Sequence, residues 1–571
     1  MQNLWSHPLL RSRYLLAVLA GLALAAAVPR LGIAGLGWGA AGMMVVAALG
    51  KRGWVCFRIG YVAGLVHYLA MLYWLLLIPY RWHGVPLGPA LGWFALSAYM
   101  AMFPAAWVWL VSEMLSPQRS PLGAQPSSGG VEPGLGRVLA KSWAGRALCA
   151  VAGAAIWVAL EMTITRLLGG FPWDLLGVSQ YQLIPLIQIA SVTGVYGVSF
   201  VMVWFSLSLV SAGVMLIRRP TVRSAWVMEL FLPLLVVAGL FHFGVRQINR
   251  TVFPPRTLKV TLVQPSIPQT VIWNPGADAE RFTVLLRLCE DALTNRTDLL
   301  IWPESALPKL LRWDRETFES VTGLARRHHV WMIVGADDME RRPGAKSPDD
   351  ADYYNSSFLI NPEGELAARY IKRSLVIFGE YVPFQRWLPF LKWFTPIEGG
   401  FTPGKGTLPF DMKDLDVKTS VLICFEDIFP QLGREGVKAD TDFLVNITND
   451  GWFGESAAQW QQAATGAFRA VENRVPLVRC TNNGLTCWID ALGRMRDIFH
   501  DRNGSVYGAG LMTVEIPVSA AGESHEQTFY NRHGDWFGWA CVGIAGVVTF
   551  LASRARAARA LRPGSGGRAP E

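Results

Sequence analysis

Three short segments carry the residue types of a cysteine-based acyl carrier. Cys424 ends the apolar run 421–424, Glu304 follows the apolar run 298–302, and Lys372 comes between them in the chain. The thiolate is the nucleophilic form of cysteine, and a free thiol has a pKa of about 8.5. Glu304 would therefore act as the base that removes the thiol proton. Lys372 would stabilise both the thiolate and the oxyanion that forms when a carbonyl is attacked.

Alternating strands and helices are expected to bring these three residues together. From about residue 257, short β-branched runs alternate with amphipathic ones. Side chains at strand ends face a crevice at the sheet edge, where the backbone N–H of Phe425 would be a second oxyanion donor. The pattern favours an α/β layered sandwich. The expected strands are 258–263, 298–302, 330–335, 358–361, 419–424, 443–448 and 476–481, and the expected helices are 278–294, 315–329 and 457–474.

The rest of the chain has the composition of a membrane protein, with 51% hydrophobic and 17% charged residues. A hydrocarbon core of roughly 30 Å needs about 20 apolar residues per helix. Lys and Arg gather in the loops on one side of the expected spans, which predicts that both termini are cytoplasmic and that the large polar domain is periplasmic. The expected transmembrane helices, about eight, are 14–28, 31–50, 54–79, 87–115, 147–165, 195–217, 225–245 and 535–553.

These spans divide the chain into four regions. Residues 1–245 hold transmembrane helices 1–7 and a flexible cytoplasmic loop at 116–136 that is rich in Pro, Gly and Ser. Residues 246–534 form the catalytic domain. Residues 535–553 form transmembrane helix 8, and residues 554–571 form a basic cytoplasmic tail.

Composition also argues against several kinds of partner. The net charge of +9 comes mostly from loops that set membrane topology. Nucleic acid binding would need a clustered basic face on a soluble module, and the sequence shows none. The seven cysteines include no C-x-x-C pair of the kind that holds a metal. We therefore expect no metal, no cofactor and no nucleic acid, and a Cys424 thiol that is not in a disulfide.

The order Glu304, Lys372, Cys424 resembles the Glu-Lys-Cys triad of the nitrilase superfamily. The surrounding strings, together with strings in the membrane half, resemble the apolipoprotein N-acyltransferase family over nearly the whole chain. The resemblance implies a nitrilase-like α-β-β-α sandwich joined to a multi-pass α-helical membrane domain. The matching strings are 263–265, 302–304, 354–356, 370–372, 378–383, 423–426, 449–454, 469–474 and 481–484, with 170–173, 196–200 and 530–536 in the membrane half.

This resemblance implies a two-step acyl transfer at the outer face of the cell inner membrane. Cys424 would take the sn-1 acyl chain of phosphatidylethanolamine or a similar phospholipid as a thioester. The α-amino group of a diacylglyceryl-cysteine at the N-terminus of an apolipoprotein would then receive it. The partners implied are the phospholipid, the diacylglyceryl apolipoprotein and the bilayer, and we expect the enzyme to be a monomer.

The resemblance also assigns residues. Glu304 would be the base, Lys372 the oxyanion stabiliser and Cys424 the nucleophile. The supporting residues would be Glu380, Glu426 and Phe425. The lipid entrance would be lined by Trp273, Asn355, Phe171 and Trp173, with Phe425 beside them. Glu426 fits equally well as a cap for the turn after its strand, and the aromatic side chains fit equally well as interfacial anchors.

Three positions depart from the family pattern, and two other functions were weighed. Phe425 stands where many members have Tyr, Ser374 where His is usual, and Ile377 where Pro is usual. These departures affect the lipid gate and leave the triad intact. One alternative is a membrane-tethered nitrilase-type amidohydrolase, for which eight spans are too many. The other is a transporter with an inert nitrilase-like module, which would need polar sites at broken helices.

Overall fold

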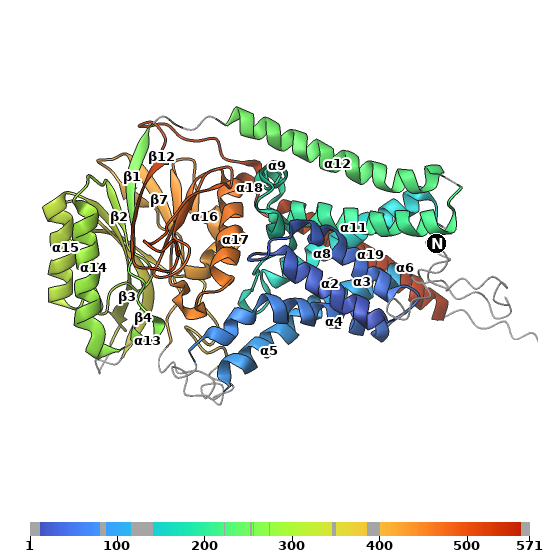
Figure 1. Ribbon diagram of the computed structural model, residues 1–571, viewed down its shortest axis with the longest axis horizontal. Coiled ribbons are helices and arrows are strands. Elements are labelled where there is room, and N and C mark those ends of the chain that lie inside the picture. Colours follow the sequence, from blue (N-terminus) through green and yellow to red (C-terminus); the bar gives the residue numbers. More distant parts are fainter. Residues whose placement is uncertain are drawn as a thin grey trace, which may run out of the picture.

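The computed structural model consists of a helical bundle and a two-sheet domain that lie side by side (Figure 1). Trp273, the loop 116–136 and most of the tail 554–571 lie outside the residues that the structure describes. The described residues are 12–79, 87–115, 141–221, 223–251, 254, 256–272, 274–344, 350–384, 387 and 400–560.

The first sheet has six strands, and its centre is parallel. In spatial order the strands are β12 (Gly510–Pro517), β1 (Thr257–Gln264), β2 (Leu299–Ile301), β3 (Trp331–Arg341), β4 (Ala351–Ile360) and β5 (Leu366–Ile371). β1, β2 and β3 run parallel to one another, while β12, β4 and β5 pair antiparallel with their neighbours. Parallel strands of this kind are buried on both faces, which explains their continuous apolar sequence.

The second sheet repeats this plan. Its strands, in spatial order, are β11 (Met495–Ile498), β10 (Cys487–Ile489), β9 (Leu477–Thr481), β8 (Phe443–Thr448), β7 (Val417–Ile423) and β6 (Phe410–Met412). β7, β8 and β9 are parallel, and the outer strands are antiparallel. The parallel strands of both sheets end at the same side of the domain as Glu304 and Cys424, which follow β2 and β7.

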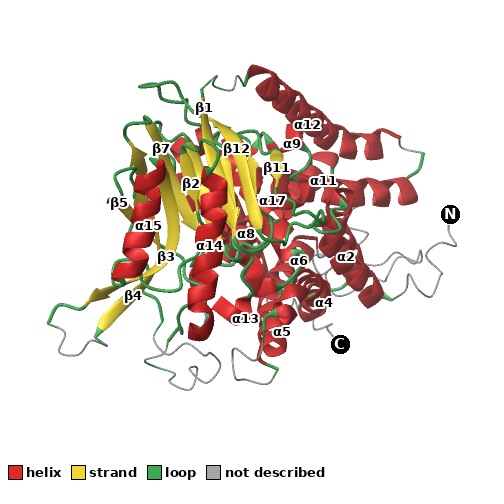
Figure 2. Cartoon of the chain, turned by 60° about the vertical axis from the view of Figure 1, so that its left-hand side comes forward, coloured by secondary structure: helices red, strands yellow, loops and turns green. Residues whose placement is uncertain are grey.

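The two sheets pack face to face through apolar side chains such as Leu262, Ile301, Ile423 and Ile447. Two helices, α14 (Asp278–Leu293) and α15 (Arg315–His328), cover the outer face of the first sheet (Figure 2). The outer face of the second sheet is covered by α16 (Pro430–Gly436) and α17 (Ala458–Asn473). The expected α-β-β-α sandwich is therefore confirmed.

Six helices of the bundle, among the residues described, are long and apolar enough to cross a membrane. They are α4 (Trp54–Met71), α5 (Gly88–Met100) continued by α6 (Met102–Leu115), α8 (Trp143–Ile164), α11 (Val195–Arg218), α12 (Arg223–Arg250) and α19 (Trp536–Ala560). The segments expected to cross at 14–28 and 31–50 form shorter apolar helices, α2 (Arg13–Ala27) and α3 (Gly37–Ala48), so the expected count of about eight spans is not confirmed. Both pack inside the bundle, α2 against α4 and α3 against α11.

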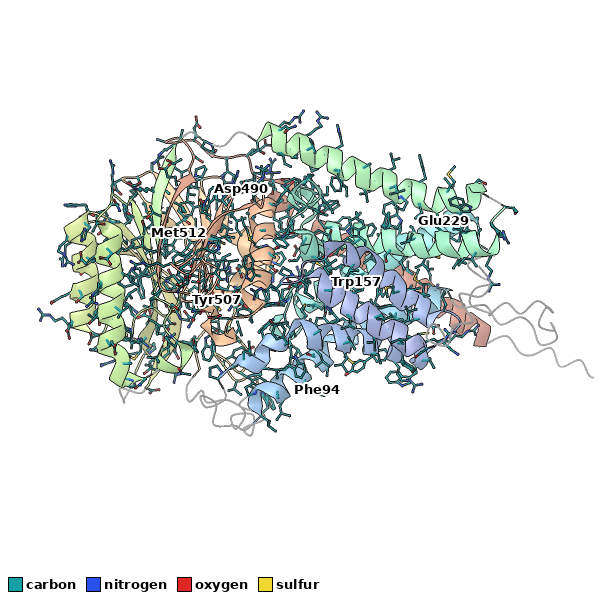
Figure 3. All side chains as sticks on the ribbon, viewed as in Figure 1. Phe94, Trp157, Glu229, Asp490, Tyr507 and Met512 are labelled. Atoms are coloured by element: carbon teal, nitrogen blue, oxygen red, sulfur yellow. The ribbon has the colours of Figure 1, made fainter. Side chains whose placement is uncertain are left out.

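Polar side chains inside the bundle are paired where they join helices. Glu229 of α12, labelled in Figure 3, forms a buried ion pair with Arg146 of α8 at 2.6 Å. A charge in hydrocarbon is costly, so intramembrane ionisable residues pair with one another. The segment between α8 and α11 folds into short helices, including α9 (Ile184–Ile187) and α10 (Ala190–Thr193), and it contacts the two-sheet domain near α18 (Phe529–His533).

Helix α17 joins the two halves of the molecule. Oε1 of Gln461 on α17 accepts hydrogen bonds from the indole N–H groups of Trp74, at 3.0 Å, and Trp173, at 2.9 Å. Its amide nitrogen donates to the backbone oxygen of Pro29 at 2.8 Å. One buried side chain thus ties the second sheet's helix layer to three separate segments of the bundle.

Candidate active site

A buried lysine lies between two carboxylates at the ends of the strands of the first sheet. Nζ of Lys372 is 2.8 Å from Oε1 of Glu380 and 3.1 Å from Oε1 of Glu304. Only 1% of Lys372 is exposed. The backbone sets its position, because its N–H donates to the carbonyl of Asn355 at 2.9 Å, which extends the β4–β5 pairing by one residue.

Asn355 bridges the same two carboxylates from β4. Its Nδ2 donates to Oε1 of Glu304 at 2.8 Å and to Oε1 of Glu380 at 2.9 Å. The other oxygen of Glu304 accepts the backbone N–H of Asn449 at 3.0 Å, and that of Glu380 accepts the N–H of Val376 at 2.8 Å. Asn355 was expected at the lipid entrance, but it is 3% exposed and its amide holds the two carboxylates in place. Its contacts are those of a residue that positions Glu304.

The charges around Lys372 keep it protonated. Burial alone would lower the pKa of Lys372, but the carboxylates of Glu304 and Glu380, and the Cys424 sulfur whenever it is ionised, outweigh burial and hold this pKa well above its usual value. A buried ammonium is stable only when it is paired and hydrogen-bonded. Lys372 is therefore a fixed cation beside Cys424.

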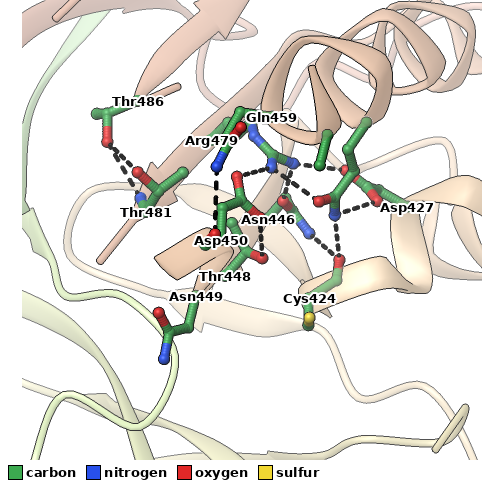
Figure 4. Close-up of polar contacts among 12 residues, drawn as sticks. Cys424, Asp427, Asn446, Thr448, Asn449, Asp450, Gln459, Arg479, Thr481 and Thr486 are labelled. Carbon is green, nitrogen blue, oxygen red and sulfur yellow. Dashed lines mark hydrogen bonds and ion pairs between the residues drawn. The ribbon is translucent and has the colours of Figure 1, made fainter. Parts of the chain in front are cut away.

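Cys424 occupies the first position after β7, where the strand turns into a short 3-10 helix (Cys424–Ile428). Its φ of 55° lies in the left-handed region, which non-glycine residues rarely adopt and which costs of the order of 1 kcal/mol. Its carbonyl accepts hydrogen bonds from Nδ2 of Asn446 at 2.8 Å and from Nε2 of Gln462 at 3.0 Å (Figure 4). Two buried amides thus hold the turn that presents the thiol.

A buried arginine organises the side chains behind this turn (Figure 4). Arg479 of β9 donates to Asp427 at 2.9 Å, to Asn446 at 2.7 Å and to Asp450 at 2.6 Å. It also donates to Oε1 of Gln462 at 3.0 Å, and so orients both amides that hold Cys424. Removing one member would leave the other polar groups buried without partners, which would cost much stability.

The environment of Cys424 keeps its thiol protonated at rest. Burial is the largest effect, and together with the negative charge of Glu304 it raises the pKa of Cys424 well above its usual value, although Lys372 opposes this. The thiol therefore needs its proton removed during attack. Glu304 and Lys372, which the sequence predicts as the base and the cation for this step, are among the charged groups that act on the Cys424 thiol.

Glu426 connects the lysine segment to the cysteine turn. One of its oxygens accepts the backbone N–H groups of Arg373, at 2.6 Å, and Ser374, at 3.0 Å. The other accepts the N–H of Ile423 at 2.8 Å and the hydroxyl of Tyr370 at 3.0 Å. The carboxylate thus caps the turn after β7 and also binds the backbone next to Lys372.

Aromatic side chains from the cysteine turn and from the bundle share one apolar core. The ring of Phe425 lies 5.6 Å from Nζ of Lys372 and 5.4 Å from the ring of Phe429. Phe171 stacks on Trp173 at 5.8 Å, and all four belong to the apolar core that continues into the bundle. Trp173 is buried, with its indole on Gln461, so it lies at the junction of the two halves. Phe171 and Phe425 are only partly buried.

The sequence interpretation missed the residues that hold the site from behind. Asn446 and Arg479 are polar residues inside otherwise apolar strands, which is a signal for a buried network. Asp337 is another omission, since its carboxylate accepts a hydrogen bond from Ser305, next to Glu304, at 3.1 Å. Among the residues described, no cluster of three or more His, Cys, Asp or Glu side chains is arranged to hold a metal ion.

Comparison with known proteins matches both halves of the chain. The model of the carbon-nitrogen hydrolase family matches residues 259–522, and that of the apolipoprotein N-acyltransferase N-terminal domain matches residues 20–208. The apolipoprotein N-acyltransferase of Geobacter metallireducens is 35% identical over 95% of this chain and 96% of its own length. Proteins of the same name from Rhizobium rhizogenes and Chlorobaculum tepidum are each 29% identical, over 94% and 70% of this chain and 95% and 76% of their own lengths.

Proposed function

The chain belongs to the apolipoprotein N-acyltransferase family, and from that premise we propose that it acylates lipoproteins through a thioester on Cys424. The acyl donor is a phospholipid such as phosphatidylethanolamine, and the chain transferred is the one at sn-1. The acceptor is the α-amino group of the N-terminal diacylglyceryl-cysteine of an apolipoprotein.

The first step moves the acyl chain to the enzyme. Glu304 takes the thiol proton while sulfur attacks the ester carbonyl, and the oxyanion is stabilised by Lys372 and by the backbone N–H of Phe425. The N–H of Phe425 is suited to this because the first N–H groups of a helix have no partner within the helix. The ester C–O bond then breaks, Glu304 returns the proton to the glycerol oxygen, and a lysophospholipid leaves.

The second step moves the acyl chain to the acceptor. The neutral α-amino group attacks the thioester carbonyl, and the same two donors stabilise the oxyanion. Glu304 accepts a proton from the amine, the C–S bond breaks, and the proton returns to Cys424. A thioester keeps the acyl group activated while one lipid leaves and another arrives, which is the advantage of the covalent route.

The observation that carries this proposal is the buried cluster of Lys372, Glu304 and Glu380 beside Cys424. The cluster gives a protonated thiol both a base and a fixed cation. The continuity of Phe425 and Phe429 with the apolar core of the bundle supports a lipid substrate. Glu380 then positions Lys372, and Glu426 positions both the lysine segment and the cysteine turn.

We propose the same topology that the loop charges predict, with eight membrane-crossing segments. These are the six long apolar helices together with α2 and α3. Residues 1–245, 535–553 and 554–571 form the membrane helices and the cytoplasmic tail, and residues 246–534 form a periplasmic catalytic domain on the inner membrane. The lipid entrance includes Phe171, Trp173 and Trp273, and the enzyme acts as a monomer. The end of α12 at Arg250 and the start of β1 at Thr257 support the first boundary.

The test is an in vitro assay with phosphatidylethanolamine and a synthetic diacylglyceryl peptide. Wild-type protein should carry a fatty acyl group on Cys424 by intact mass, and should transfer it to the peptide amine. Cys424→Ala should do neither while remaining folded, and Lys372→Ala should lose on the order of 10²-fold in rate. Wild-type protein that stays unacylated and hydrolyses small amides would instead indicate the amidohydrolase.

Orientation is tested separately by labelling cysteines from outside intact spheroplasts. Glu319→Cys, on the exposed face of α15, should react with a membrane-impermeant maleimide. Ser224→Cys, beside the basic residues between α11 and α12, should react only after lysis. The reverse pattern would overturn the proposed topology.

A further inference from the structure

The side-chain oxygen of Asn355, Oδ1, is buried and has no hydrogen-bond donor among the residues that the structure describes. The direction of this amide is fixed, because its Nδ2 faces oxygens of Glu304 and Glu380, and a flipped amide would point its oxygen at two carboxylates. Oδ1 must therefore face away from the carboxylates. A buried acceptor left without a donor costs about 1–3 kcal/mol, so a donor is required on that side.

Asp337 is the residue placed to supply this donor. It is the direct cross-strand partner of Asn355 in the β3–β4 ladder, and paired residues of an antiparallel ladder project their side chains from the same face of the sheet. Every second residue of a strand lies on the same face, so Asp337 shares a face with Ile333 and Gly335. That face looks toward the site, because Ile333 belongs to the core between the sheets and Gly335 lies against the backbone of Pro303 and Glu304. Asp338, the next residue, points the opposite way and binds Arg312.

We propose that Asp337 is a positioning residue that acts as a neutral carboxylic acid, donating its O–H to Oδ1 of Asn355 and thereby fixing the amide that holds Glu304 and Glu380. Ser305 donates to the other side of the same carboxyl group, at Oδ1 of Asp337. A chain of hydrogen bonds then runs from Ser305 through Asp337 and Asn355 to Glu304. This inference rests on the proposed function, because it describes how the base of that reaction is held.

The charges that face Asp337 favour its neutral form. Burial is the largest effect, and together with the carboxylates of Glu304 and Glu380 it outweighs the Ser305 hydrogen bond and the Lys372 charge and raises the pKa of Asp337 to about 7. Arg281 of α14 also faces Asp337, but its NH1 binds the backbone oxygen of Ile272. A third carboxylate beside one lysine would leave the cluster with uncompensated negative charge, which low-dielectric surroundings disfavour.

The proposal predicts a particular dependence on pH. Below a pH of about 7 the carboxyl group of Asp337 is protonated and can donate, whereas above it the carboxylate would face Oδ1 of Asn355 with no proton between them. Acylation of Cys424 should therefore fall as pH rises through this pKa. An amide in place of the acid would donate at every pH.

The experiment measures single-turnover acylation of Cys424 by phosphatidylethanolamine from pH 6 to 9 in wild type, Asp337→Asn and Asp337→Leu. Asp337→Asn should match the wild-type rate at pH 6 within about 3-fold and lose the alkaline fall assigned to Asp337. Asp337→Leu should be on the order of 10-fold slower at every pH, as expected for one lost hydrogen bond to the network. Asp352→Asn, the same change at a partly exposed position of β4 where the carboxylate binds Arg342, is the matched control and should behave as wild type.

Three results would overturn the inference. If Asp337→Asn is as slow as Asp337→Leu, the residue works as a carboxylate, and if Asp337→Leu matches wild type, the residue has no positioning role. An unchanged alkaline fall in Asp337→Asn would also overturn it. Failure of the proposed function is distinguishable, because wild-type protein would then form no thioester at any pH.

Discussion

Gln462 donates a hydrogen bond to the backbone carbonyl of Cys424 at 3.0 Å, so helix α17 holds the turn that carries the proposed nucleophile. The preceding residue on the same helix, Gln461, binds Trp74 and Trp173 of the bundle. One helix therefore contacts both the reacting turn and the membrane half. Changes in the packing of the bundle should consequently alter the position of Cys424.

This coupling is tested by Gln461→Leu. The change removes the acceptor of two buried indole N–H groups and the donor to Pro29, so we expect a loss of about 1–3 kcal/mol in stability. Because α17 also holds the Cys424 turn, acylation of Cys424 should slow on the order of 10-fold. Thermal unfolding and acylation rates are the measurements. Gln182→Leu, on an exposed glutamine, is the control, and equal effects of the two changes would contradict the coupling.

Gly335→Ala should displace the proposed base. A Cβ at Gly335 would lie 2.1 Å from the carbonyl oxygen of Pro303 and 2.8 Å from Cα of Glu304, so the turn that carries Glu304 must move. A displacement of about 1 Å can cost 10²-fold in rate, and we expect a loss on the order of 10- to 100-fold. Gly323→Ala on helix α15 meets only the end of Arg327, so it should be neutral or slightly stabilising. A fully active Gly335→Ala would show that Glu304 does not need this position.

The reactivity of Cys424 toward iodoacetamide should report the charges around it. Its raised pKa means that alkylation at neutral pH is slow and increases as pH rises. Glu380→Gln removes a negative charge that raises this pKa, so the alkylation profile should move to lower pH. Lys372→Met removes a positive charge that lowers it, so the profile should move to higher pH. Peptide mass spectrometry of Cys424 gives both profiles, and shifts in the same direction would contradict the assigned electrostatics.

Glu426→Gln should disconnect the lysine segment from the cysteine turn. The carboxylate accepts four hydrogen bonds, and an amide would turn an N–H₂ group toward some of those donors. We expect a loss of about 2–4 kcal/mol in stability, since buried donors left unpaired cost about 1–3 kcal/mol each. Urea unfolding of the purified protein measures it. The control is Glu435→Gln, whose more exposed carboxylate binds the side chain of Arg373, and a stability loss of the same size there would contradict the role of Glu426.

The sequence predicted the central strands of both sheets because their apolar runs are continuous. All seven expected strands and the helices at 278–294, 315–329 and 457–474 are present. β3 and β4 are longer than expected, because β3 continues to Arg341 and β4 begins at Ala351, and the other ends differ little. The strands not predicted are β5, β6, β10, β11 and β12; β10 has three residues, and the other four are the edge strands of the two sheets. Such strands form because a neighbour is available for pairing, and this information is not in their own sequence.

The same distinction applies to the site. Glu304, Lys372 and Cys424 could be found because each lies in a short characteristic string, and the structure brings Glu304 and Lys372 within 3.1 Å. The bridging place of Asn355 could not be read from the string around it, because its contacts with Glu304 and Glu380 depend on how β4, the β2 turn and the loop after β5 meet in space. Long-range hydrogen bonds of this kind leave no periodic signal.

Helix α17 is buried on all sides. Every residue from Ala458 to Asn473 except Trp460 is buried, because a sheet occupies one side of the helix and the bundle occupies the other. The outer side of this helix, where another copy could otherwise bind, is covered by the bundle of the same chain. Self-association of the protein would have to use some other part of its surface.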